Sequence, residues 1–381
     1  MALILSHQTA CEYWLSPYAK SAYRPDPDKV HLFADPNYLV SEKEHYCSQW
    51  SDAGKPSRTL RSNKASRVYG ASESSSIIEP VSLRRNGKEA TTPLTTKLAY
   101  EFFSKHRDIF SAPYHVLAMN ADLRRRIKDV VFRTCSGKIP PNAFYRIETD
   151  VYVVSPEFCF VQLASELSLV QLVKLGIELT SQYVVMADNN LLYRYPVVNV
   201  DGIKRFQRLS SNMKGNRISC QAVQYIADNS ASPRETDLLL LLCLPCRLGG
   251  FGFPLPQMNA RVAIPSYYRH LFQGSYYVCD FLWKQGSVAI EYDSDEFHVG
   301  SDRIAHDSSR RTALSVVGVD VISVTNSQIK SKTEMNNIAR LVSRKLDRSF
   351  RLARGYDYES RQQELRLGIF GSGSRLFESG F

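Results

Sequence analysis

The residues with the clearest potential for chemistry lie in one short predicted hairpin. Two β-rich runs, Tyr276–Trp283 and Val288–Asp293, flank Lys284–Ser287, which is typical of a tight turn. A two-residue turn in that stretch would pair the strands so that Asp280 lies opposite Glu291. Directly opposed side chains on one sheet face have Cβ atoms about 5 Å apart, close enough for two carboxylates to share one cation.

A divalent metal ion is the economical explanation of this acidic pair. The alternation of a strand places Asp293 on the same face as Glu291. Without a cation or a proton between them, facing carboxylates repel and cost stability. Oxygen ligands favour Mg²⁺ or Mn²⁺ over zinc. The prediction depends on register, because a slip of one residue would send Asp280 and Glu291 to opposite faces.

The residues that follow the hairpin also suggest a site. His298 leaves the second strand and has an ordinary pKa near neutrality, which suits a general base, although a polar loop histidine explains it equally well. A helix is predicted from Ser301 or Asp302 to about residue 317, followed by Gly318 as its end and by a strand over 319–325.

A family resemblance is carried by the residues Asp280, Glu291, Asp293, His298, Asp307, Arg311, Leu314, Gly318 and Asn326. In this order and spacing they resemble the PD-(D/E)XK nucleases, and within them a small domain family similar to the very-short-patch repair endonuclease. The resemblance implies a restriction-endonuclease-like fold and Mg²⁺-dependent hydrolysis of DNA. The chain departs from the pattern at Ser294 in place of glycine, at His298 one residue late, at Ser323 in place of arginine, and at Asp293 in place of lysine.

On this reading Asp280 and Glu291 would hold Mg²⁺ or Mn²⁺, and Asp293 would orient water or join the metal shell. Phosphate contacts would come from arginines of the following helix, namely Arg303, Arg310 and Arg311. Arg311 has an alternative role, since Asp307 precedes it by four residues and the two side chains can pair on the helix.

Glu235 has two competing explanations. Ser232, Pro233 and Glu235 have the spacing of a helix N-terminus, in which the serine caps the helix and the glutamate reaches back to the cap. The nuclease resemblance instead implies that this glutamate reaches the metal, directly or through water. Sequence reasoning favours the metal role and leaves the capping role open.

The N-terminal half offers a second resemblance and a basic helix. Leu5–Ala10 and Val153–Ala164 are similar to two signature stretches of type IV abortive-infection antitoxins, which implies DNA binding and transcriptional regulation. A helical basic segment follows within 202–226, and its side chains Lys204, Arg205 and Arg208 either contact a phosphate backbone or form a solvated face.

Composition limits the class of protein. The chain of 381 residues is long enough for two or three domains, and its formal net charge of +10 favours a polyanionic partner such as nucleic acid. Eight scattered cysteines do not resemble a disulfide framework, and residues 1–6 lack the features of a signal peptide. We therefore expect a cytoplasmic protein without a membrane-spanning segment.

Together these observations predict an α/β protein with a mixed sheet. An α+β region over 1–200, expected to be DNA-binding or antitoxin-like, would contain a polar loop near 41–92, and a basic helical connector would span 201–231. A nuclease-like domain would span 232–348, before a basic mobile tail over 349–381. The predicted function is a metal-dependent DNA endonuclease. The alternative is a DNA-binding regulator or antitoxin-like protein with a catalytically silent nuclease fold, and RNA is not excluded as a substrate.

Overall fold

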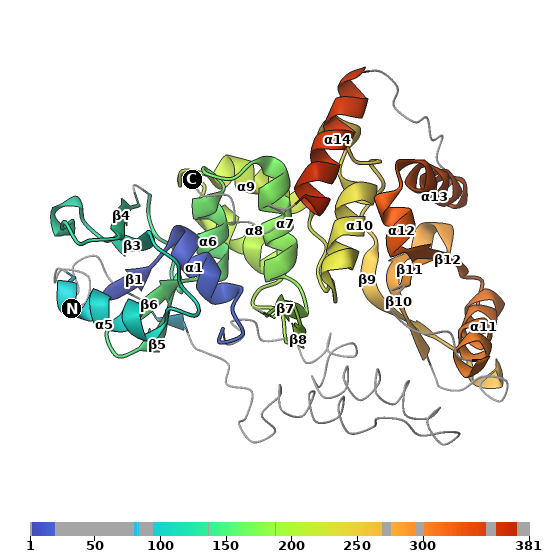
Figure 1. The fold of residues 1–381 in the computed structure, drawn as a ribbon, viewed down its shortest axis with the longest axis horizontal. Coiled ribbons are helices and arrows are strands. Elements are labelled where there is room, and N and C mark those ends of the chain that lie inside the picture. The colour runs from blue at the N-terminus through green and yellow to red at the C-terminus, as the bar shows by residue number, and fades with distance from the viewer. Residues whose placement is uncertain are drawn as a thin grey trace. The chain divides into compact units, whose positions relative to one another are not determined.

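The fold consists of two compact units of mixed α and β structure (Figure 1). The computed structural model describes residues 2–19, 80–81, 83, 94–135, 137–186, 188–268, 276–293, 301–347 and 356–371, with only the backbone described at 301–307 and 356. Among the described residues, those up to 228 form the first unit and those from 229 onward form the second. Most of the polar loop expected near 41–92, like His298, lies outside the described residues.

A mixed six-stranded sheet forms the centre of the first unit, in the order β2-β5-β6-β1-β3-β4. The central strands β1 and β6 are parallel and apolar, and every one of their residues is buried. A strand covered on both faces needs such a continuous apolar run. The strands are β1 (Leu3–Leu5), β2 (Pro80–Val81), β3 (Tyr114–Ala118), β4 (Val130–Thr134), β5 (Phe144–Glu148) and β6 (Val151–Val154).

Helices pack against this sheet, and further helices pack against those helices (Figure 1). Ser6 is the N-cap residue of α1, and the Ser155 hydroxyl accepts a hydrogen bond from the Phe158 nitrogen at the start of α6. The indole of Trp14 ties α1 to the end of β6 by donating to the Val154 carbonyl at 2.8 Å. The helices are α1 (His7–Trp14), α5 (Thr96–Lys105), α6 (Pro156–Leu163), α7 (Leu169–Leu179), α8 (Val200–Leu209) and α9 (Asn216–Ala222), and a small hairpin is formed by β7 (Tyr183–Val185) and β8 (Leu191–Tyr193).

The basic segment expected to connect two domains belongs to the first unit instead. Ile203 and Phe206 of α8 are buried, and the Phe206 ring stacks on Phe158 of α6 with centroids 5.6 Å apart. The prediction of a connector was based on the charged residues of α8. The buried apolar stripe of this helix determines where it packs.

The second unit is built on a four-stranded sheet in the order β12-β11-β10-β9. Strands β9, β10 and β11 are antiparallel neighbours, whereas β12 runs parallel to β11 because helix α11 carries the chain between them. The strands are β9 (Gln257–Ala263), β10 (Tyr276–Trp283), β11 (Val288–Asp293) and β12 (Asp320–Thr325). These bounds confirm the predicted hairpin and the strand that follows the predicted helix.

Helices enclose this sheet. In α10 every residue from Glu235 to Cys243 is buried, so its leucine run is a core helix. Ala313 and Leu314 of α11 pack against the sheet residues Leu282 and Ala289. The helices are α10 (Pro233–Cys243), α11 (Ser301–Val316), α12 (Asn326–Lys330), α13 (Lys332–Lys345) and α14 (Tyr356–Phe370).

The expected mobile tail contains a packed helix. Tyr358, Leu365 and Ile369 of α14 are buried. Gly249 allows this packing, since its φ is +87° and a Cβ there would lie 2.3 Å from the Arg361 carbonyl oxygen. Within the part of the chain that the structure describes, no helix has the length and apolar character required to cross a membrane.

Candidate functional site

The hairpin adopts the register that the sequence predicts. Phe281 pairs with Ile290 and Trp283 with Val288, around a turn over Lys284–Gly286. The next position in the same register sets Asp280 opposite Glu291. Since Ala289 shares this face with Glu291 and packs against α11, the acidic pair lies on the helix-covered side of the sheet.

Asp280 reaches across to the neighbouring strand. Its carboxylate Oδ2 accepts a hydrogen bond from the backbone nitrogen of Tyr292 at 2.8 Å. This contact fixes the side chain beside Glu291, because Tyr292 is the next residue along β11. The position of Asp280 is therefore set by the hairpin itself.

Glu291 is held on one oxygen only. Its Oε2 accepts a hydrogen bond from the Arg310 guanidinium at 2.6 Å, and the two side chains are 13 % and 20 % exposed respectively. The guanidinium also donates to the Val278 carbonyl, which anchors it against β10. The other oxygen, Oε1, is buried without a hydrogen-bond partner among the described residues, and the Cys279 thiol adds a contact to the same carboxyl group. A buried carboxylate oxygen in this state favours a proton or a cation.

The pKa of Glu291 also indicates that this carboxyl group favours a proton or a cation. Burial raises the pKa of Glu291, and the nearby charge of Asp280 raises it further, to about 8, although Arg310 opposes the shift. The carboxyl group therefore holds a proton at neutral pH unless a positive charge replaces that proton.

The pair has the chemistry to hold Mg²⁺ or Mn²⁺. Magnesium commonly takes one or two protein carboxylates and keeps water or phosphate oxygens in its other positions. Asp280 and Glu291 supply those two, with one unsatisfied oxygen already present. Among the residues described, no three Asp, Glu, His or Cys side chains gather in a group able to hold a metal. A metal at this pair would therefore depend on water and substrate for the rest of its shell.

Glu235 is engaged at the start of α10. Its Oε2 accepts from the Ala231 nitrogen at 2.9 Å and from Asn259 Nδ2 at 2.7 Å, and its Oε1 accepts from the Ser232 hydroxyl at 3.0 Å. The side chain is 4 % exposed. Of the two explanations that the sequence left open, the structure displays the serine cap, in which the Ser232 hydroxyl accepts from the Glu235 nitrogen. The Glu235 carboxylate accepts from Ala231 and from the Ser232 hydroxyl rather than from the Ser232 backbone nitrogen, and its metal role stays a prediction.

The remaining predicted residues are dispersed. Asp293 ends β11 opposite Thr325, two residues beyond Glu291. Arg311 donates to the Ser323 hydroxyl at 2.7 Å. His298 and the side chain of Arg303 lie outside the described residues. Exposed positions on α8, in the first unit, hold Lys204, Arg205 and Arg208.

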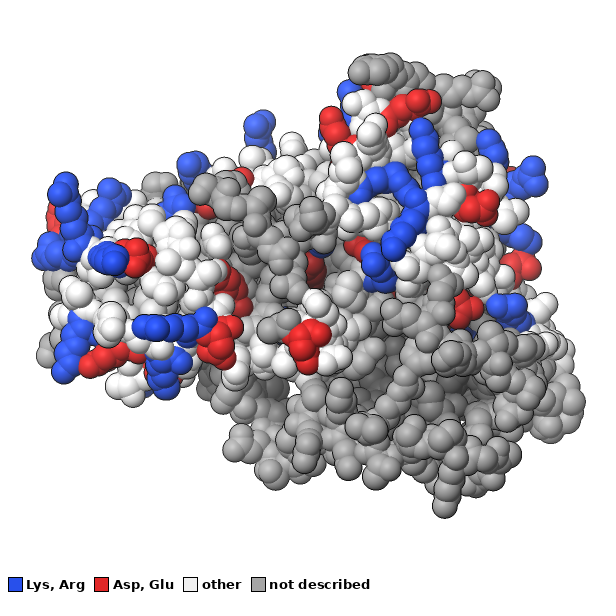
Figure 2. Space-filling view, in the orientation of Figure 1, with Lys and Arg blue, Asp and Glu red and all other residues white. Residues whose placement is uncertain are grey.

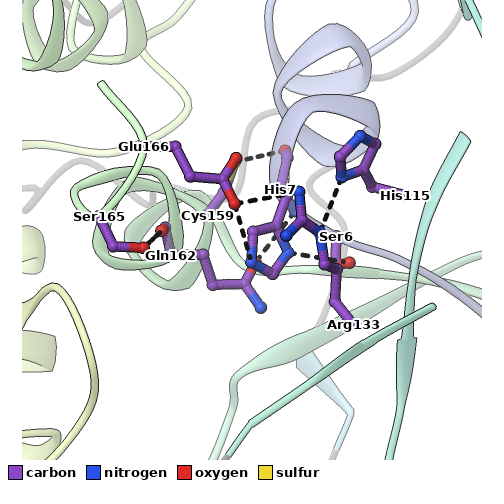
Figure 3. A network of polar contacts seen from close by, with 8 residues as sticks. All are labelled: Ser6, His7, His115, Arg133, Cys159, Gln162, Ser165 and Glu166. Carbon is purple, nitrogen blue, oxygen red and sulfur yellow. Dashed lines mark hydrogen bonds and ion pairs between the residues drawn. The ribbon is translucent and has the colours of Figure 1, made fainter. Parts of the chain in front are cut away.

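A polar cluster in the first unit was missed by sequence reasoning (Figure 3). Arg133 of β4 donates from Nε to His115 Nδ1 at 3.1 Å and pairs with Glu166 at 3.1 Å. The Nε2 of His7 lies 3.9 Å from the same carboxylate. The four residues come from separate segments, so their types alone could not indicate that they meet.

The histidines of this cluster are uncharged at neutral pH. Burial, followed by the charge of Arg133, lowers the pKa of His7 to about 3 and that of His115 to about 4. His7 also has a φ of +49°, which is unusual for a residue with a side chain. A strained backbone at a convergent polar cluster is a pattern often found at functional sites.

The two antitoxin-like stretches meet at this cluster. The backbone nitrogen of His7 donates to Gln162 Oε1 at 3.1 Å, and the Cys159 thiol donates to the His7 carbonyl at 3.3 Å. Strands β1 and β6, which precede these residues, are parallel neighbours. The resemblance proposed for these two stretches was the available signal in the sequence, and it gave no indication of His115 or Arg133.

Comparisons with known proteins add little about this site. No known protein family matches the chain, and no solved structure matches it. The chain is similar to the uncharacterized proteins MT2308 and Rv2248 of two Mycobacterium tuberculosis strains, with 28 % identity over 98 residues in each case. The match covers 26 % of this chain and spans a third of the length of those relatives.

Proposed function

We propose that the second unit is a metal-dependent endonuclease that hydrolyses phosphodiester bonds in DNA. The observation that carries this proposal is the buried, unsatisfied Oε1 of Glu291 directly across the hairpin from Asp280. The mixed sheet with α11 packed on the side of the acidic pair is compatible with the restriction-endonuclease-like fold that the sequence resemblance implies.

In this proposal the chain's own residues position the reaction. Asp280 and Glu291 would hold Mg²⁺ or Mn²⁺, and the backbone contact from Tyr292 keeps Asp280 beside Glu291. The bound ion would activate water and stabilise charge on the scissile phosphate. Arg310, already beside the pair, supplies a guanidinium that matches the geometry of a phosphate.

A second candidate function is supported by the same arginine. Arg310 lies 2.6 Å from Glu291 and already places a positive charge beside that carboxylate. A guanidinium in that place can substitute for a metal ion, which favours a nuclease fold that binds DNA without cutting it. The two candidates differ in metal uptake and in turnover.

The test compares the wild type with Asp280→Asn and Glu291→Gln on plasmid DNA, single-stranded DNA and RNA, each with Mg²⁺ and with Mn²⁺. A matched control is Asp320→Asn, which makes the same change on the neighbouring strand β12, at a side chain 55 % exposed. We expect cleavage by the wild type and the control, and a loss of at least about 100-fold in both site variants, as for removal of one electrostatic catalytic group.

Calorimetric titration with Mn²⁺ provides the second measurement. Uptake by the wild type that disappears in Asp280→Asn supports the enzyme. If folded wild-type protein neither takes up metal nor cuts any substrate, the endonuclease proposal is rejected and the DNA-binding alternative remains. Cleavage that survives both substitutions also removes this site as the catalytic centre.

A further inference from the structure

A hollow on the second unit combines positive charge with hydrogen-bond acceptors. It has a volume of about 430 Å³ and lies between the junction of α12 with α13 and one face of α14. Its cationic residues are Lys330, Lys332 and Arg366. Figure 2 shows Lys and Arg side chains gathered where α12, α13 and α14 lie in Figure 1. A hollow of this size is within the range of small-molecule sites.

One buried group in this hollow lacks a partner. Gln362 is 3 % exposed, and its Nε2 donates to the Tyr358 hydroxyl at 3.1 Å. Its Oε1 is buried and accepts no hydrogen bond from any described residue. Burial of an unsatisfied acceptor costs free energy, so a ligand that donates to Gln362 would recover part of that cost.

The remaining residues of the hollow have complementary chemistry. Glu359 and Gln363 lie on the same face of α14 as Gln362 and offer further acceptors. Leu367 and Phe370 add an apolar surface. Acceptors beside an apolar surface suit a base with an exocyclic amine, and the lysines suit a phosphate.

On the cationic side of the hollow, Arg366 is held by contacts with neighbouring residues. Its guanidinium donates to the Ile329 carbonyl at 3.0 Å and to the Lys330 carbonyl, at the end of α12. It also lies over the Phe370 ring, 5.4 Å from the centroid. Lys330 and Lys332 flank this anchored charge on exposed positions, where a phosphate can reach them.

We infer that this hollow binds a nucleotide with an amino-bearing base, adenine or cytosine, with its phosphate on Lys330 and Lys332. The ligand is either a free mononucleotide or one unit of a single-stranded nucleic acid. The hollow contains neither residue of the acidic pair, so this inference does not depend on whether the second unit cuts DNA.

The experiment measures binding to the full chain by calorimetry, with AMP, IMP, adenosine, inorganic phosphate and a single-stranded octamer of deoxyadenosine. We expect AMP to bind at least about tenfold more tightly than IMP, which lacks the amine, and more tightly than adenosine, which lacks the phosphate. Tighter binding of the octamer than of AMP identifies the strand as the ligand, and the reverse order identifies the free nucleotide.

Charge-reversal variants distinguish binding in this hollow from nonspecific attraction to the positive charge of the protein. Lys330→Glu with Lys332→Glu should weaken AMP binding at least about tenfold, whereas the matched pair Arg340→Glu with Arg344→Glu, on exposed positions of α13 outside the hollow, should change it less than about twofold. Asp280→Asn should leave AMP binding unchanged, so failure of the nuclease does not affect this test.

Gln362→Met tests the base contact without a large change in shape. We expect weaker AMP binding and no loss of thermal stability, because removal of the buried unsatisfied acceptor offsets the lost hydrogen bond to the Tyr358 hydroxyl. The inference is overturned if AMP and IMP bind equally, if both charge-reversal pairs weaken AMP binding alike, or if Gln362→Met lowers stability and leaves AMP binding unchanged. It is also overturned if no nucleotide binds at millimolar concentration.

Discussion

At the scale of single residues, Glu291 shows how a hairpin can create a reactive carboxyl group. The sequence places it opposite Asp280, and the fold buries it under α11. Each of these effects raises its pKa, and Arg310 offsets only part of the rise. With a pKa near neutrality, this carboxyl group changes its protonation when the pH changes around neutrality or when a cation binds beside it.

The pH dependence of stability tests this state. The pKa of Glu291 is raised in the fold to about 8 from an ordinary 4.5, so the proton is bound more tightly in the folded protein. The stabilisation is full below pH 4.5 and is lost as pH rises to 8. Relative to Glu291→Gln, we expect the wild type to lose at least about 1 kcal/mol across this window in urea unfolding. A constant difference between the two proteins would contradict the raised pKa.

The histidines of the first unit should show the opposite dependence. The pKa values of His7 and His115 are lowered, so their stabilisation is full above pH 6.5 and is lost as pH falls toward 4 and 3. Nuclear magnetic resonance titration should find both rings neutral at pH 6. In Arg133→Gln, both pKa values should rise, because a neighbouring positive charge is removed. Titration of either ring near pH 6.5 in the wild type would contradict this assignment.

At the scale of elements, the start of α10 combines local and tertiary contacts. The Ser232 hydroxyl accepts from the Glu235 nitrogen at 3.2 Å, and the Glu235 carboxylate also binds Asn259, 24 residues away. A cap that also reaches a neighbouring strand contributes to the packing of the whole unit. The serine cap was predictable from sequence, whereas the contact with Asn259 was not, since it depends on β9 passing beside the helix.

Substitutions at this helix start distinguish capping from metal binding. Ser232→Ala should cost about 1 kcal/mol of unfolding free energy, and Glu235→Ala about 2–3 kcal/mol, since two buried donors and the half-buried Ser232 hydroxyl lose their acceptor. Urea unfolding measures both. Glu235→Gln should keep Mn²⁺ uptake in calorimetry if the residue only caps the helix. Loss of uptake with unchanged stability would restore its predicted role at the metal.

At the scale of the whole molecule, the net charge of +10 predicts that the nucleic-acid binding we propose is governed by electrostatics. Affinity for double-stranded DNA should fall as salt rises, because binding releases counterions. Lys204→Glu, Arg205→Glu and Arg208→Glu together should weaken binding and reduce the slope of log affinity against log salt by roughly one unit per phosphate contact removed. Fluorescence anisotropy over a salt series measures both quantities.

The matched control changes the same number of charges elsewhere on the first unit, at Arg124, Arg125 and Arg126, which are also exposed. An equal loss of affinity in both triple variants would mean that total charge drives binding. A loss confined to the α8 triple variant would identify α8 as the nucleic-acid surface.

Short-range physics made the hairpin, its register and the helix caps predictable from sequence alone. Alternation of side chains, turn residues and serine caps act over a few residues, so Asp280 could be placed opposite Glu291 without coordinates. The same rules misplaced α8, because they emphasised its charges and not its buried stripe.

Only the tertiary structure decided which distant side chains meet. Arg310 reaches Glu291 because Ala313 and Leu314 pack α11 onto the sheet, and His7 meets Arg133 because β1 and β4 join one sheet. Such contacts follow from packing of whole elements, which depends on the summed burial of many apolar groups and leaves no local trace in the sequence.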